Sequence, residues 1–162
     1  MKIRSLQKKD FPEVALIYKE GLLTGIASFE TEVPTWRHWN EKFLEQCRYV
    51  ATLDQKVIGW CALSAVSKRA VYRGVAETTI YMDLKHSGKG YGQRLLKHLI
   101  KKSEIEGFWT LQASIFTQNL PSIKTHHNCG FVTVGIREKI GQREGIWYDN
   151  LFLERRSKKF SK

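Results

Sequence analysis

The sequence predicts an α/β domain in which helices cover both faces of a mixed, mostly antiparallel β-sheet. Strand-like and helix-like periodicities follow one another in the order βαα, βββ, α, β, α, ββ, which a sheet between two helical layers accommodates. A glycine-rich turn joins a long strand to an amphipathic helix, an arrangement typical of ligand sites in open α/β sheets. The 162 residues contain no internal repeat or linker. We therefore expect one domain over residues 1–156 and a basic tail over residues 157–162.

The first third of the chain predicts a short strand and two helices. The strand begins within residues 3–6, and Asp10 gives a cap-like start to a helix whose apolar side chains recur at helical spacing. Residues 21–32 are irregular. Thr35 then caps a second helix, whose apolar stripe runs to Cys47. Two helices therefore precede most of the strands.

The rest of the chain predicts six strands separated by two helices. The expected elements are a hairpin over residues 49–53 and 57–64, a strand over 75–82, a helix over 93–106, a strand over 110–116, a helix over 122–129 and an antiparallel pair over 131–140 and 146–153. Alternation within residues 75–82 places Glu77 and Tyr81 on one face of the sheet and Ile80 and Met82 on the other.

The turn at residues 87–92, Ser-Gly-Lys-Gly-Tyr-Gly, points most directly to a ligand. Glycines at alternate positions let the backbone approach a ligand closely, and the first N–H groups of the following helix carry about half a positive charge. We therefore expect a phosphorylated ligand here, with a plain connecting turn as the alternative. The third glycine comes one residue early for a dinucleotide fingerprint. Lys89 is followed by Gly90 instead of the hydroxyl residue of a Walker A loop.

The net charge of +11 is compatible with several classes of partner. Nucleic acid, an anionic membrane surface and a polyanionic cofactor all attract a basic protein. The Lys and Arg residues are scattered, with a denser cluster only near the C-terminal end, and no predicted helix presents a continuous basic stripe. This distribution disfavours a nucleic-acid-binding module.

Membrane insertion, secretion and metal binding find no support in the sequence. No apolar run approaches the roughly 20 residues of a membrane span, and residues 1–4 lead into an amphipathic pattern instead of a signal peptide. We therefore expect a cytoplasmic protein. Cys47, Cys61 and Cys129 lie far apart and do not match a metal-ligand spacing, so we expect buried thiols and neither a disulfide framework nor a metal site.

Several segments together resemble the GNAT superfamily of acyl-CoA-dependent N-acetyltransferases, along nearly the whole chain. The core of the resemblance is a strand ending Ile80-Tyr81-Met82, the glycine turn, Asn119 and residues 122–131. Within the superfamily the sequence is most similar to the phosphinothricin and methionine sulfone N-acetyltransferase branch. That similarity rests on residues 27–32 (Ala-Ser-Phe-Glu-Thr-Glu), Tyr72-Arg73, Glu77 and residues 145–149 (Gly-Ile-Trp-Tyr-Asp).

The resemblance implies the GNAT acyl-CoA N-acyltransferase fold, acetyl-CoA as the co-substrate and no metal. The residues that it assigns to coenzyme binding are Ile80, Tyr81, Met82, Gly88, Lys89, Gly90, Tyr91, Gly92, Gln93 and Asn119. The family usually begins its turn with Arg or Gln, whereas this chain has Ser87, so we expect a weaker grip on the pyrophosphate. The main-chain donors of residues 89–93 remain, and Lys85 or Lys89 can restore the charge.

The resemblance also assigns catalytic roles. Transfer from a thioester to an amine needs a base, a donor for the developing oxyanion and a proton for the leaving thiolate. Glu77 is the expected general base, with a solvated strand carboxylate as the alternative. His126 is the candidate general acid or cofactor contact, with a structural histidine as the alternative. The oxyanion donor is expected to be a main-chain N–H near Tyr81 or Met82, at a bulge.

Substrate selection is expected to fall to two segments, which contribute Phe29, Glu30, Lys68, Arg69, Tyr72 and Arg73. An Arg such as Arg73 offers a bidentate fork for an amino acid carboxylate, and Phe29 would cover an apolar side chain. The alternatives are that Phe29 belongs to the core and that Arg73 is a surface charge.

The predicted function is acetylation of the amine of a small amino acid or an analogue such as phosphinothricin, methionine sulfone or methionine sulfoximine. A protein or peptide N-acetyltransferase is the alternative enzyme, and a nucleic-acid-binding module is the alternative from another class. The resemblance further implies a homodimer through the C-terminal strands, which Leu151 and Leu153 permit, with the second subunit closing the substrate pocket. Trp147 is expected to lock the last strand in place.

Overall fold

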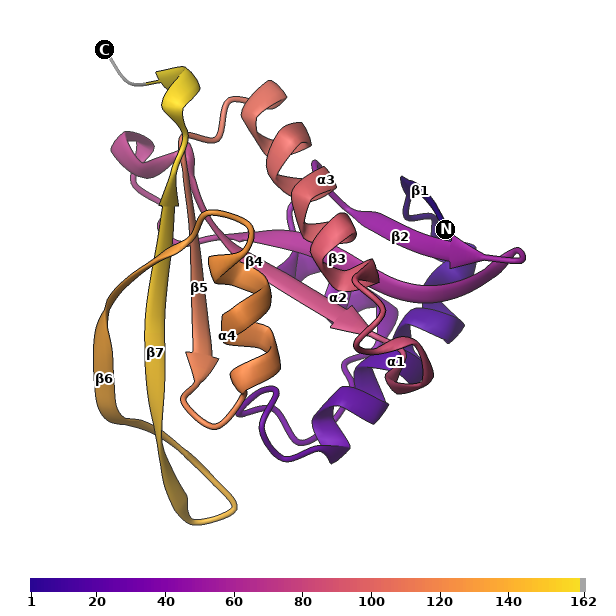
Figure 1. Ribbon diagram of the computed structural model, residues 1–162, viewed down its shortest axis with the longest axis horizontal. Coiled ribbons are helices and arrows are strands. Elements are labelled where there is room, and N and C mark those ends of the chain that lie inside the picture. Colours follow the sequence, from indigo (N-terminus) through magenta and orange to yellow (C-terminus); the bar gives the residue numbers. More distant parts are fainter. Residues whose placement is uncertain (161–162) are drawn as a thin grey trace.

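The structure, a computed structural model that describes residues 1–160, is a seven-stranded sheet between two helical layers (Figure 1). The strand order is β1-β2-β3-β4-β5-β7-β6, and every neighbouring pair is antiparallel except β4 and β5. The elements are β1 (Lys2–Ser5), α1 (Phe11–Leu23), α2 (Trp36–Lys42), β2 (Tyr49–Leu53), β3 (Lys56–Ala65), β4 (Val75–Met82), α3 (Tyr91–Ile105), β5 (Thr110–Phe116), α4 (Leu120–His127), β6 (Val132–Arg143) and β7 (Ile146–Arg156). The predicted fold class is confirmed.

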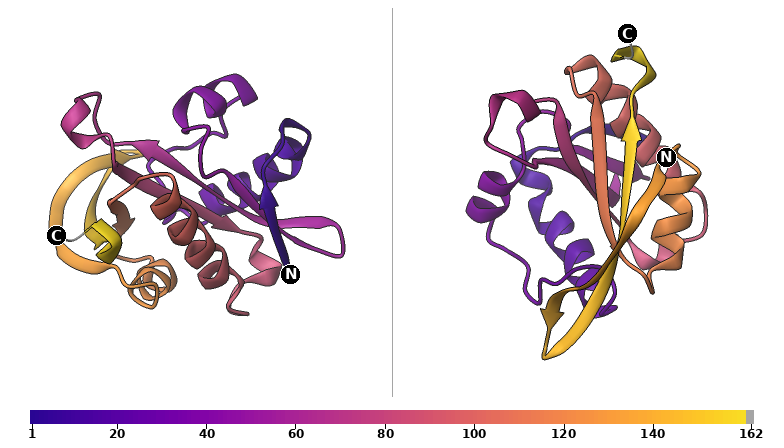
Figure 2. Two further views of the ribbon diagram at one scale, coloured as in Figure 1. Left: turned by 90° about the horizontal axis from the view of Figure 1, so that it is seen from above. Right: turned by 90° about the vertical axis from the view of Figure 1, so that its left-hand side faces the viewer.

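The helices lie in two layers on opposite faces of the sheet (Figure 2), and an apolar cluster packs each layer against the strands. The larger cluster lies against α3 and α4 and includes Leu95, Leu96 and Leu99, which are fully buried. The smaller cluster lies under α1 and α2 around Trp39 and Trp60. It reaches no strand beyond β4, so within residues 1–160 no helix of this cluster covers the same face of β5, β7 and β6.

The start of α1 differs from the prediction. The Asp10 side chain does not cap the helix. Its carboxylate instead accepts a hydrogen bond from the Gln7 N–H at 2.8 Å and pairs with Arg4 at 2.7 Å, which ties the helix start to β1. An ion pair to the preceding strand therefore replaces the expected cap.

The predicted cap of α2 is confirmed, because the Thr35 hydroxyl accepts a hydrogen bond from the His38 N–H at 3.4 Å. The helix nevertheless stops at Lys42, since Phe43 has an extended backbone with ψ 143°. Phe43 and Cys47 are still buried, so the apolar stripe was the correct signal for burial but overestimated the length of the helix.

The C-terminal segment is more ordered than an irregular tail. β7 runs to Arg156, Ser157 is buried and donates its N–H to the carbonyl of Trp109 at 2.8 Å, and Lys158–Phe160 form a 3₁₀ turn. Residues 161–162 of the predicted tail lie outside the described residues. All three cysteines are buried thiols, as predicted. No helix in the described part of the chain is long and apolar enough to cross a membrane.

The parallel pair β4–β5 is joined over only a short distance. Its register consists of Val75 with Thr110, Ala76 with Leu111 and Glu77 with Gln112. Beyond Glu77 the two strands diverge, although each continues for several residues (Figure 1). Since β4 remains paired with β3 along its whole length, the divergence opens a gap at the centre of the sheet.

Candidate active site

Main-chain groups of β4 face the gap between the diverging strands. The Asp83 N–H donates to the carbonyl of Ile58 at 2.9 Å, so alternation along an antiparallel pair directs the N–H of Tyr81 toward β3 as well. The intervening residues, Ile80 and Met82, therefore direct their N–H and C=O groups toward the gap. The β3–β4 register is unbroken, so the bulge that we expected in β4 is absent from it.

The glycine turn sits at the carboxyl end of β4 and leads directly into α3. Gly88 and Gly90 have φ of +74° and +76°, a left-handed backbone that favours glycine, and the space where a Cβ would lie is open at both. Gly90 is the residue before α3 and provides no side-chain cap, so the first N–H groups of the helix keep their donor capacity. A methyl group at Gly92 would approach Met82 to 3.3 Å, which places the helix start beside the gap.

Glu77 is partly buried and lies at the last position where β4 is paired with β5. Burial raises the pKa of its carboxyl group, while the charges of Arg137 and Lys42 act in the opposite direction. A raised pKa moves a carboxylate toward the range in which it can exchange a proton near neutral pH. Glu77 therefore has a raised pKa and sits where the gap begins, and its role as a general base stays a prediction.

His126 is almost completely buried, with 2% of its surface exposed. Its Nδ1 lies 2.8 Å from the carbonyl of Ser122 and must donate, while its Nε2 lies 3.5 Å from the Thr78 hydroxyl. Burial lowers the pKa of the imidazole, so the neutral ring carries its single proton on Nδ1. This arrangement leaves Nε2 without a proton to give, and it favours a positioning role over general acid catalysis.

Asn119 caps α4, as expected of an amide before a helix. Its Oδ1 accepts a hydrogen bond from the Ser122 N–H at 3.3 Å, and its Nδ2 donates to the carbonyl of Ile26 at 3.3 Å. The second bond ties the irregular segment after α1 to the start of α4. Contact with a coenzyme stays a prediction for this side chain.

Phe29 belongs to an aromatic cluster at the carboxyl end of β5. Its ring centroid lies 4.6 Å from that of Phe116 and 6.4 Å from that of Tyr148, and Phe116 and Tyr148 stack at 4.7 Å. A methyl group at Gly141 would come within 2.7 Å of the Phe29 ring, so β6 closes over it. Glu30, the next residue, pairs with Lys42 at 3.6 Å.

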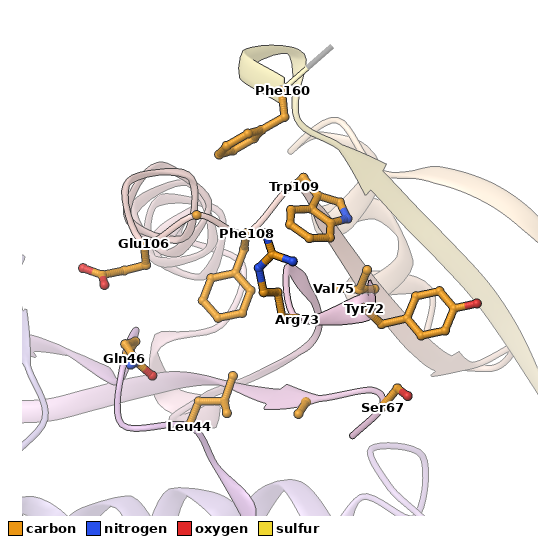
Figure 3. Close-up of a pocket in the computed structure, with 12 residues that line it drawn as sticks. Leu44, Gln46, Ser67, Tyr72, Arg73, Val75, Glu106, Phe108, Trp109 and Phe160 are labelled. Carbon is orange, nitrogen blue, oxygen red and sulfur yellow. The ribbon is translucent and has the colours of Figure 1, made fainter. Parts of the chain in front are cut away.

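The other predicted substrate residues lie at the amino end of β4, around a cavity of about 590 Å³ (Figure 3). The Arg73 guanidinium projects between Phe108 and Trp109 and lies 5.5 Å from the Trp109 ring centroid. Tyr72 also lines this cavity, and its ring carries Arg69 at 5.4 Å. Val75, which shares the face of Glu77, connects the cavity to β4, about 7 Å along the strand from Glu77.

The structure thus divides the predicted substrate residues between two places. Phe29 and Glu30 lie toward the carboxyl end of the diverging strands, whereas Tyr72 and Arg73 line the cavity at the opposite end and Arg69 lies over the Tyr72 ring. The cations that act on Glu77 are Arg137 and Lys42, and neither is one of the predicted substrate residues.

Sequence reasoning missed Arg137, Lys42, Thr78 and the cluster partners of Phe29. The Thr78 hydroxyl donates to the carbonyl of Gln112 at 3.1 Å, which strengthens the last link before the strands separate. Alternation along β4 places the Thr78 side chain on the face of the sheet opposite to Glu77. The sequence pattern does not predict the bond to Gln112. Arg137 and Lys42 reach Glu77 from β6 and α2, so no spacing along the chain relates them to it.

Comparison with known proteins identifies the family of the chain. A phosphinothricin N-acetyltransferase from Streptomyces viridochromogenes is 30% identical over 159 residues, which cover 96% of this chain and 87% of that protein. Among solved structures, a GNAT superfamily phosphinothricin acetyltransferase from Sinorhizobium meliloti in complex with AcCoA has a TM-score of 0.87 at 29% identity, covering 96% of this chain and 87% of that chain. A ribosomal-protein-alanine N-acetyltransferase from Brucella melitensis has a TM-score of 0.89 at 25% identity, covering 97% and 100%.

The family match extends over the same elements that build the site. Residues 3–152 match the family described as Acetyltransferase (GNAT) domain, a range that includes the glycine turn, the diverging strands and the aromatic cluster. The chain therefore belongs to the GNAT family of N-acetyltransferases.

Proposed function

We propose that this protein transfers the acetyl group of acetyl-CoA to the amine of a small amino acid or a close analogue. This proposal rests on the position of Glu77, whose partly buried carboxyl group has a raised pKa and lies where β4 and β5 separate. The phosphinothricin acetyltransferases described above, which match nearly the whole chain, support the substrate class.

The residues present fit acetyl-CoA. The left-handed glycines and open space at Gly88 and Gly90, together with the uncapped start of α3, suit a pyrophosphate group. The main-chain groups of Ile80 and Met82 suit the amide groups of a pantetheine arm. When bound, acetyl-CoA supplies an activated acetyl group as a thioester. We assign the turn residues Lys89, Tyr91 and Gln93, with Asn119, to the same surface.

Glu77 would accept the proton that the amine loses as its nitrogen bonds to the acetyl carbon, directly or through a water molecule. The carbon–sulfur bond of the thioester would break in the same transfer, and coenzyme A would leave as a thiolate that takes up a proton from solvent. The Met82 N–H, which faces the gap, would donate to the acetyl oxygen as negative charge develops there. Thr78 and His126 would act as positioning residues, because the Thr78 hydroxyl joins β4 to the carbonyl of Gln112 on β5 and His126 packs against that hydroxyl from α4.

On the substrate side we assign Phe29 and its aromatic neighbours to the apolar part of the amino acid, and Glu30 to the edge of that site. Arg73 and Tyr72 line the cavity at the amino end of β4, away from Phe29, and Arg69 lies over the Tyr72 ring, so we assign these three residues to the outer edge of the substrate site and not to the substrate carboxylate. Arg73 stacked on Trp109 already presents a guanidinium without a carboxylate partner among residues 1–160.

A second candidate function is acetylation of a protein or peptide amine. The ribosomal-protein-alanine N-acetyltransferase that shares this fold at 25% identity favours it. Thiol release from acetyl-CoA in the presence of phosphinothricin, methionine sulfone, methionine sulfoximine and a set of N-terminal peptides separates the two. We expect kcat/KM to be highest with one of the amino acid analogues. Preferred turnover of a peptide would show that the second candidate is correct.

We also propose that the protein forms a homodimer through the edge strand β6. Leu153 is buried and Leu151 packs against the larger cluster, so these two residues do not form the contact surface. Trp147 is 56% exposed. Exposed apolar residues instead follow β6 and the hairpin, namely Val132, Val134, Ile136, Ile140, Ile146 and Trp147. A long apolar edge strand is a typical site for pairing with another chain.

Replacing Glu77 by Gln should lower kcat/KM by about 10²- to 10⁴-fold, because the amide cannot accept the amine proton. In the wild-type protein kcat/KM should fall as the pH drops through the raised pKa of Glu77, since the protonated carboxyl group is no longer a base. The variant should lose this limb of the pH profile. Glu154→Gln, on the same face of the sheet, is the matched control. Unchanged turnover in Glu77→Gln would disprove the assignment.

Replacing Ser87 by Arg should tighten acetyl-CoA binding by about five- to tenfold in calorimetry, because a charge-assisted hydrogen bond to a phosphate becomes available. Ser5→Arg adds the same charge on an exposed position of β1 and should leave the affinity unchanged. Equal tightening in both variants would show a general effect of charge and not a contact at the turn.

Replacing Ile136 by Asp should convert the dimer to a monomer in size-exclusion chromatography with light scattering, because an unpaired charge would be buried in the interface. Ile105→Asp on α3 is the control, since Ile105 is 59% exposed and Ile136 is 58% exposed. A monomeric wild-type protein at micromolar concentration would contradict the proposed dimer.

A further inference from the structure

The face of the sheet that carries Glu77 continues across three more strands. Residues paired across neighbouring strands point to the same face. Glu77 pairs with Gln112, and two positions further along β5 Ser114 pairs with Phe152. Phe116 pairs with Asn150, which in turn pairs with Arg137 on β6. The side chains of Phe152, Asn150 and Arg137 therefore lie on the face of the proposed base.

Arg137 is directed across this face toward Glu77. Its guanidinium carbon lies 4.0 Å from the centroid of the Phe152 ring, one strand inward from β6, and its charge acts on Glu77. Among residues 1–160 no carboxylate lies within ion-pair distance of it. A guanidinium that rests on an aromatic ring without an acidic partner presents its N–H fork to a ligand carboxylate.

Asn150 adds an unpaired acceptor beside Arg137. The residue is 7% exposed, and its Oδ1 is buried without a hydrogen-bond donor among the described residues. Buried amide oxygens are ordinarily paired, and leaving one unpaired is unfavourable. Its strand neighbour Phe116 belongs to the aromatic cluster with Phe29 and Tyr148. The acceptor therefore lies beside the surface that we assign to the apolar part of the substrate.

We propose that Arg137 and Asn150 form the substrate-recognition subsite of this enzyme, an inference that rests on the proposed function. Arg137 binds the carboxylate of the amino acid, and Asn150 Oδ1 accepts a hydrogen bond from an uncharged N–H or O–H group on its side chain. The preferred substrates are then small amino acids whose side chain carries such a donor.

Methionine sulfoximine and methionine sulfone test the role of Asn150, because they differ by an imino N–H in place of an oxygen. The wild-type enzyme should favour the sulfoximine by about tenfold in kcat/KM, the effect of one hydrogen bond to a buried acceptor. Asn150→Val should bring the two values within about twofold. Asn150→Asp keeps an acceptor and should keep the preference, and thermal unfolding checks that both variants are folded.

Equal kcat/KM for the two substrates in the wild-type enzyme would overturn the role of Asn150 while leaving the proposed function intact. The same holds if Asn150→Val retains the tenfold preference. Failure to acetylate either compound, or any other amino acid analogue, would overturn the proposed function together with this inference.

Arg137→Gln tests the carboxylate contact. The variant should raise the KM for methionine sulfoximine at least tenfold, with a smaller change in kcat, and it should not change the KM for the decarboxylated amine. Lys139→Gln removes the same charge from the same strand and should behave as wild type. An unchanged KM in Arg137→Gln, or an equal rise for the decarboxylated amine, would overturn the assignment.

Discussion

The site depends on the place where the β4–β5 ladder ends. Only Val75, Ala76 and Glu77 of β4 are paired with residues of β5. The last bond between the two strands is the one that the Thr78 hydroxyl donates to the carbonyl of Gln112. A paired β-strand would use all of its N–H and C=O groups within the sheet. Because the ladder stops, the N–H and C=O groups of Ile80 and Met82 that face β5 have no ladder partner among residues 1–160.

The two faces of the sheet differ in what covers them. On one face, α3 and α4 cover the larger apolar cluster, and the start of α3 brings unpaired N–H groups beside Met82. On the other face, the smaller cluster ends at β4, and the strands beyond it carry polar and aromatic side chains. In the proposed mechanism, a coenzyme held on the first face meets an amine held on the second where the ladder ends. Glu77 lies at that junction.

The electrostatics of the second face follow from the same geometry. Glu77 is buried enough for its pKa to rise, yet Arg137 and Lys42 are close enough to limit the rise. The balance between desolvation and nearby cations therefore depends on β6 and α2, two elements far from β4 in sequence. A bound carboxylate at Arg137 would weaken the influence of that cation on Glu77, which links substrate binding to the strength of the base.

The sequence by itself determined the local features of this protein. Hydrophobic periodicity located the α-helices and strands of the described residues, alternation along residues 75–82 separated Glu77 and Tyr81 from Ile80 and Met82, and the glycine turn predicted an anion site, because each of these signals depends on neighbouring residues. Only the tertiary structure decided where the β4–β5 ladder ends, which N–H groups of β4 are free, and that Arg137 and Asn150 share a face with Glu77. These features depend on strand register, including a shift between Arg137 and Gly141 in the β6–β7 pair. A shift of one residue would reverse the faces, and no pattern within a single strand records it.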